Sequence, residues 1–142
     1  MSLNVELIKQ KINQLQNRLH QLNSMEFSLQ ELQITTDIQD LLSFRLQQSV
    51  ELAIDITMHL IANLDQLQFK DQAKEAFDQL SQAKIISPKT ANQMALATGF
   101  RNLIVHQYDD IDFKQLFKDY GQDIKSLQKF SQEILKFLNT IN

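Results

Sequence analysis

Four polar side chains cluster near the end of an otherwise apolar helical pattern, in the segment G-F-R-N-L-I-V-H-Q-Y. They are Arg101, Asn102, His106 and Tyr108. On one continuous α-helix, Asn102 and His106 share a face because they are four apart, and Arg101 and Tyr108 lie within about 20° of each other. Arg101 and His106, however, lie about 140° apart around the axis. One helix does not bring these two together unless the Arg side chain curls or the site is completed elsewhere, whereas two copies crossing at a dimer axis would.

An Arg and a His in one site suit chemistry on a phosphodiester. The Arg101 guanidinium offers a permanently charged fork of donors, and an imidazole such as His106 exchanges a proton near neutral pH. Cleaving RNA needs a base for the 2′-OH, a cation for the charge on phosphorus and an acid for the leaving oxygen, so the chemistry requires no metal or cofactor. Asn102 is expected to orient His106 or the phosphate, and Tyr108 to hold substrate or carry a regulatory modification.

These residues resemble the HEPN superfamily of α-helical ribonucleases, and within it the HepT-like toxins. The family signature is Arg-x-x-x-x-His-x-Tyr, usually with a polar residue after the Arg, and the four side chains fit it without a gap. The resemblance extends from about Val5 to Leu135. It implies a homodimeric, metal-independent endoribonuclease whose Arg101 and His106 act on RNA at a cleft between protomers. It also implies a partner, a minimal nucleotidyltransferase antitoxin of the MntA type, that adenylylates Tyr108.

Other functions stay open. A noncatalytic HEPN module would use Arg101 and His106 to hold a nucleotide, or would only bind a nucleotidyltransferase partner. From the pattern alone, the two residues are equally a surface charge and a half-buried structural imidazole in a helical oligomerisation protein. The formal net charge of −3 argues against a broad polyanion-binding surface, so any contact with RNA must be local.

The composition favours an all-α fold. The 142 residues include only 2 Gly and 1 Pro, and this length suits one domain with its own core. We expect a single HEPN-like helical domain over residues 1–142, an antiparallel bundle of four main helices plus one short helix. The absence of Cys excludes a disulfide framework. No apolar run approaches about 18 residues and the first residues lack a signal-peptide pattern, so we expect a cytoplasmic protein.

The apolar spacing predicts which helices position the motif. Helices are expected over residues 5–22, 36–63, 73–80, from 88 through the motif, and 113–138, the last pairing with the first. Residues 24–35 are expected to form a loop with one helical turn. Three N-caps are predicted: Thr36 with Gln39 reaching back, Ser87 followed by Pro88, and Asp112. The motif helix is expected to bury Met94, Leu96, Ala97, Phe100, Leu103, Ile104 and Val105.

A second polar strip lies on the long helix over residues 36–63. Arg45, Gln48, Asp55 and His59 fall within roughly 80° of one another. The functional interpretation places this strip in the cleft, with Arg45 near the phosphate. The alternative is a solvent-facing strip or an interhelical ion pair. A metal site at Glu51, Asp55 and His59 is disfavoured because Glu51 and His59 lie about 80° apart.

Overall fold

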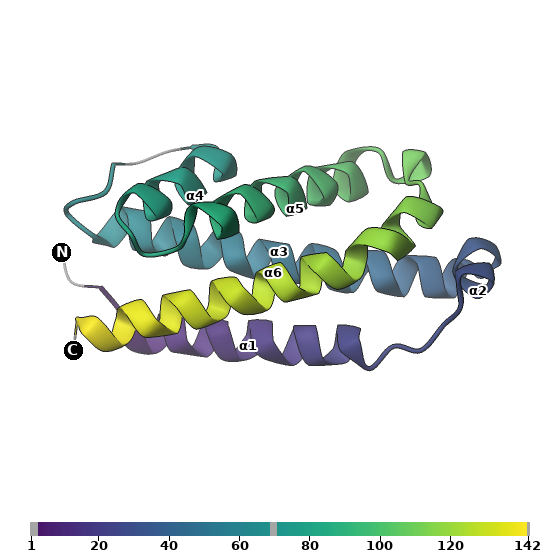
Figure 1. Cartoon of the computed structure of the whole chain (residues 1–142), viewed down its shortest axis with the longest axis horizontal. Coiled ribbons are helices and arrows are strands. Elements are labelled where there is room, and N and C mark those ends of the chain that lie inside the picture. Colours follow the sequence, from purple (N-terminus) through teal and green to yellow (C-terminus); the bar gives the residue numbers. More distant parts are fainter. Residues whose placement is uncertain (1–2, 69–70, 142) are drawn as a thin grey trace.

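A computed structural model describes residues 3–68 and 71–141 of the chain. These residues contain no strand and form the helices α1 (Val5–Asn23), α2 (Leu29–Ile34), α3 (Thr36–Asn63), α4 (Ala73–Gln82), α5 (Pro88–His106), η1 (Tyr108–Asp110) and α6 (Phe113–Thr140). Four helices are long and run lengthwise along the molecule (Figure 1). The predicted all-α bundle of four main helices with a short one, α4, is therefore confirmed, and α2 and η1 are additions to it.

The bundle is built around apolar stripes that face a shared interior. α1 packs against α3 and α6, which confirms the expected pairing of the first and last helices, and α5 packs against α3, α4 and α6. The three-four stripe of α1 is at most 1% exposed at Ile8, Ile12, Leu15, Leu19 and Leu22. At the α4 side, Phe77 and Phe130 meet edge to face with ring centroids 6.0 Å apart. The core thus fixes the axis of α5 and with it the motif.

Two of the predicted caps start their helices as expected. The Ser87 hydroxyl accepts a hydrogen bond from the backbone N–H of Thr90 at 3.1 Å, and Pro88 occupies the first position of α5. The Asp112 carboxylate accepts from the backbone N–H of Gln115 at 3.1 Å at the start of α6. Each cap supplies an acceptor for a helical N–H that has no partner within its own helix.

The predicted cap at Thr36 is wrong. Thr35 is the N-cap residue of α3 and makes no side-chain capping bond, while Thr36 is already helical. The side chain of Gln39 is used elsewhere, because its Nε2 donates to the carbonyl of Leu32 at 2.8 Å. Gln39 therefore ties α3 to the preceding helix instead of closing its own first turn.

That preceding helix, α2, extends the single turn predicted within residues 24–35. Its N-cap is a capping box: the Ser28 hydroxyl accepts from the Glu31 N–H at 3.1 Å, and the Glu31 carboxylate accepts from the Ser28 N–H at 3.0 Å. The buried Leu32 anchors α2 to the core. α2 lies beside the start of α3, at the end of the bundle away from the start of α1 (Figure 1).

Leu96 and Val105 of α5 were expected inside the bundle, and both expectations are wrong. Leu96 is 70% exposed because it lies about 160° around the axis from the fully buried Met94. Val105, in the last turn of α5, is 45% exposed. Across the described part of the chain, no helix combines the length and apolar character needed to cross a bilayer.

Candidate active site

The motif lies at the end of α5, where that helix meets the first turns of α3 and α6 (Figure 1). Arg101, Asn102 and His106 belong to the last turns of the helix. The backbone leaves the helical region at Gln107, with φ −143° and ψ 48°, so Tyr108 belongs to η1. The predicted shared face of Arg101 and Tyr108 is therefore wrong, because it assumed a helix that continued through Tyr108.

Because the backbone leaves the helix at Gln107, the side chain of Tyr108 reaches α3. Its hydroxyl donates a hydrogen bond of 2.5 Å to the Oδ1 atom of Asp40, and its ring packs edge to face on Phe113 with centroids 6.2 Å apart. Burial, followed by the hydrogen bond to Asp40, raises the pKa of Tyr108 to about 12. The phenol is thus protonated at neutral pH. Asp40, which contacts the motif from α3, was not identified from the sequence.

The three remaining motif residues differ in accessibility. Asn102 and His106, which share a face of the helix, are both exposed, so His106 is not the half-buried structural imidazole of the alternative interpretation. Arg101 is half-buried, and its Nε is enclosed with no hydrogen-bond partner among the described residues. An enclosed donor without an acceptor is costly. The residue as a whole is only half-buried and its two Nη atoms are not enclosed in this way, so these are the donors that an anionic ligand would meet.

Arg45 lies away from these groups. Its Nη1 donates to the backbone carbonyl of Gln21, near the end of α1, at 3.3 Å. Arg45 and Asp40 are five apart on α3, hence about 140° around its axis, and Asp40 is the residue that holds Tyr108. The structure does not bring Arg45 to the motif within one chain, and its substrate-binding role stays a prediction.

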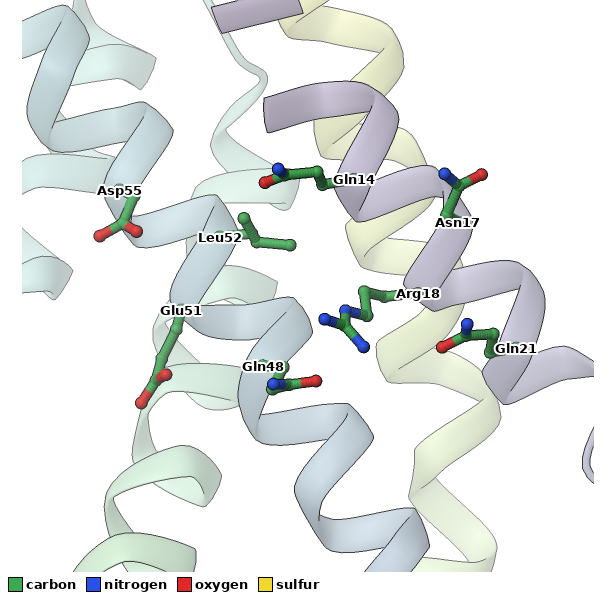
Figure 2. A pocket seen from close by; sticks show the side chains of 8 residues that line it. All are labelled: Gln14, Asn17, Arg18, Gln21, Gln48, Glu51, Leu52 and Asp55. Atoms are coloured by element: carbon green, nitrogen blue, oxygen red, sulfur yellow. The ribbon is translucent and has the colours of Figure 1, made fainter. Parts of the chain in front are cut away.

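Gln48 and Asp55 of the polar strip on α3 face α1, together with Glu51, whereas the half-buried His59 does not line the space between these helices. Gln48, Glu51 and Asp55 line a hollow of about 490 Å³ between the two helices. Figure 2 shows Arg18 reaching into this space from α1, between Gln48 and Gln21. Within residues 3–68 and 71–141, no three His, Asp or Glu side chains are grouped so that they could hold a metal ion, and this includes Glu51, Asp55 and His59.

The sequence matches one family model and one curated relative. The family model described as ribonuclease HepT-like matches residues 8–134, which include the whole motif. A curated relative, the tRNA nuclease HepT of Aphanizomenon flos-aquae (strain 2012/KM1/D3), is 34% identical over 104 residues, covering 72% of this chain and 70% of that protein.

Solved structures share the fold. The Bacillus subtilis cytosolic protein YutE, of unknown function, superposes with a TM-score of 0.85 at 16% identity, covering 99% of this chain and 94% of that one. A tri-AMPylated Shewanella oneidensis HEPN toxin, in complex with MNT antitoxin, has a TM-score of 0.83 at 20% identity, covering 94% and 98%. The extent of the family match, together with the curated relative, shows that this chain belongs to the ribonuclease HepT-like family.

Proposed function

We propose that this chain, as a single HEPN-like domain, is a metal-independent endoribonuclease toxin that works as a cytoplasmic homodimer. We also propose that a nucleotidyltransferase antitoxin restrains it by adenylylating Tyr108. The observation that carries the proposal is the placement of the intact motif in a family of ribonucleases, with His106 open to solvent and Arg101 only half-buried.

In this mechanism His106 is the general acid and base. Its imidazole takes the proton of the ribose 2′-OH, the 2′-oxygen attacks the adjacent phosphorus, and the bond to the 5′-oxygen breaks as that oxygen is protonated. Arg101 binds the scissile phosphate and stabilises the charge that gathers on it. Asn102, on the same face as His106, orients the imidazole or the phosphate. Arg45 is proposed to contact RNA outside the immediate site.

A second copy of the chain would explain two features of the surface around the motif at the end of α5. Arg101 and His106 lie on different sides of α5, so a partner chain is needed to place one beside the other. Large apolar side chains are also exposed on the elements around the motif: Leu41 (42%), Phe44 (53%) and Val105 (45%). Leu41 and Phe44 are three apart on α3 and share a face, and an exposed apolar face supports a surface that another protein covers.

The similar proteins support the substrate and the partner. The curated relative is named a tRNA nuclease, so we propose tRNA as the first substrate class to test. The Shewanella toxin is AMPylated and bound to an MNT antitoxin, which supports the same kind of partner and modification here. AMP on Tyr108 would add a negative phosphate and a bulky nucleoside next to the motif, and both would compete with RNA for Arg101.

The test compares purified wild-type protein with the variants Arg101→Ala and His106→Ala on tRNA and on total RNA. We expect wild-type protein to cut RNA and each variant to lose about 100-fold or more in rate, since general acid–base catalysis is worth at least that much. His20→Ala is the matched control, because His20 is an exposed His on α1. Circular dichroism checks that all variants remain folded.

The alternatives give different results. Cleavage by His106→Ala at the parental rate would show that the mechanism is wrong. A wild-type chain that cuts no RNA but binds the nucleotidyltransferase would instead support the noncatalytic HEPN module.

A further inference from the structure

The hydroxyl of Tyr108 is held by a carboxylate from a different helix. Tyr108 Oη donates a hydrogen bond of 2.5 Å to Asp40 Oδ1. Asp40 is exposed and Tyr108 is half-buried, so the pair lies at the surface of the bundle. The packing of the ring on Phe113 limits its rotation. The phenolic oxygen is thus presented in one place, with its proton directed at a carboxylate.

We propose that Asp40 is the general base that positions Tyr108 and accepts its proton during nucleotidyl transfer. This inference rests on the proposed adenylylation of Tyr108 and assigns part of that reaction to the toxin chain itself. In the same way, protein kinases place an Asp carboxylate to accept the proton of the attacking substrate hydroxyl.

The step balances with a nucleoside triphosphate as the only co-reactant. The Oη atom of Tyr108 attacks the α-phosphorus of ATP and forms the new O–P bond. The bond between the α-phosphorus and the oxygen leading to the β-phosphate breaks, and pyrophosphate leaves with that electron pair. The phenolic proton passes to the carboxylate of Asp40 and from there to water.

The state of the phenol explains why a nearby base is needed. With its pKa raised to about 12, only roughly one Tyr108 side chain in 10⁵ is ionised at pH 7. The attacking group is therefore the neutral phenol, whose proton must leave as the O–P bond forms. A carboxylate already hydrogen-bonded to that proton meets the geometric requirement for a general base.

The surroundings of Tyr108 provide a matched control. Asp109 also raises the pKa of Tyr108 by its charge, yet its side chain makes no hydrogen bond to the phenol. Ser43 lies one turn along α3 from Asp40, and its hydroxyl lowers the pKa of Tyr108. Asp109→Asn therefore removes one negative charge near the phenol while keeping the Asp40 contact.

The experiment measures transfer of AMP from ATP to the full-length chain by its purified nucleotidyltransferase partner, followed by intact-protein mass. The chain has 2 tyrosines, and all proteins in this experiment carry Tyr120→Phe, so that Tyr108 is the one tyrosine left. We expect Asp40→Asn to slow transfer about 100-fold at saturating ATP. Its rate should rise with pH above neutrality, about tenfold per unit, because the ionised phenol must replace the lost base. Asp109→Asn should stay within about threefold of the parent protein.

A titration without the partner tests the contact itself. The chain has 0 Trp, so in the Tyr120→Phe background the ultraviolet absorbance reports the ionisation of Tyr108 alone. Asp40→Asn removes a hydrogen bond and a negative charge that both raise the pKa, so the Tyr108 pKa should fall from about 12 towards its ordinary value. An unchanged pKa would contradict the contact.

The two proposals fail in different ways. If the partner transfers no AMP to the parent protein, the proposed adenylylation of Tyr108 is overturned, and the role of Asp40 with it. If the parent protein is modified and Asp40→Asn is modified equally fast with the same pH profile, only the role of Asp40 is overturned.

Discussion

Asp123 is a carboxyl group in surroundings that disfavour its charge. It lines a hollow of about 460 Å³ between α5 and α6, whose apolar wall includes Phe100 and Leu103. Burial, and then the nearby charge of Asp119, raise the pKa of Asp123 to about 6. The folded state therefore holds this proton more tightly than the unfolded state does.

This shift predicts a pH-dependent cost in stability. Because the folded pKa lies above the unfolded value of 3.8, the favourable contribution of protonated Asp123 is complete below about pH 4 and is lost as the pH rises through about 6. Asp123→Asn cannot ionise and should raise the free energy of unfolding by about 1 kcal/mol at pH 7, a value reduced for the partial exposure of the group. Urea denaturation at pH 4 and pH 7 measures it.

The control for this prediction is Asp119→Asn, which removes only the weaker of the two causes. It should stabilise the fold less than Asp123→Asn does at pH 7. An Asp123→Asn effect of the same size at pH 4 and pH 7 would show that ionisation is not its cause.

Some residues of the candidate site could be identified from the sequence and one could not. Arg101, Asn102, His106 and Tyr108 were recognisable because their spacing is local. Asp40 was not, because it lies 68 positions from its partner and is exposed in the first turns of α3, where an acidic side chain already suits the helix dipole. The contact exists only because the backbone leaves the helix at Gln107.

At the scale of helices, the start of α5 is closed by a residue of α6. The Glu133 carboxylate accepts a hydrogen bond from the backbone N–H of Ser87 at 2.8 Å, and it also accepts from the hydroxyl of Thr90. In a capping box this acceptor comes from the helix's own third residue. Here another helix supplies it, so one carboxylate caps α5 and joins it to α6.

Removing that carboxylate should loosen the attachment of α5. Glu133→Gln keeps the shape of the side chain but loses the charge near the helix N-terminus, and we expect the free energy of unfolding to fall by about 1 kcal/mol. Chemical denaturation measures the change, with Glu26→Gln as the control because Glu26 is exposed in the segment between α1 and α2. Equal stability of the two variants would contradict the role of Glu133.

The helices were predictable where local rules decide them. Apolar spacing placed the long helices, and Ser87 and Asp112 were identified as caps from residue type and position. Gln39 and Glu133 were not predictable in the same way, because their partners lie on other helices. Leu96 was misplaced since an apolar residue was assumed to face inward, whereas it lies on the outer side of α5.

At the scale of the whole molecule, the scarcity of Gly and Pro favoured helices, and the apolar spacing arranged them as an all-α bundle. The assembly is a separate matter, because no pattern within one chain shows where a second copy lies. The net charge of −3 also argues against a broad RNA-binding surface, so the proposed cleft must supply its positive charge locally, from Arg101 of each chain. We therefore propose that Arg101 of one chain acts with His106 of the other.

A heterodimer that pairs an Arg101→Ala chain with a His106→Ala chain tests this claim most directly. Each chain is made with a different affinity tag, the mixed dimer is isolated by two successive purifications, and its RNA cleavage is compared with both variant homodimers. A twofold dimer with shared sites retains one intact pair in the heterodimer, so we predict about half of the wild-type activity from two inactive chains. A heterodimer as inactive as its parent homodimers, under conditions where wild-type protein cleaves RNA, would contradict a site shared between the two chains.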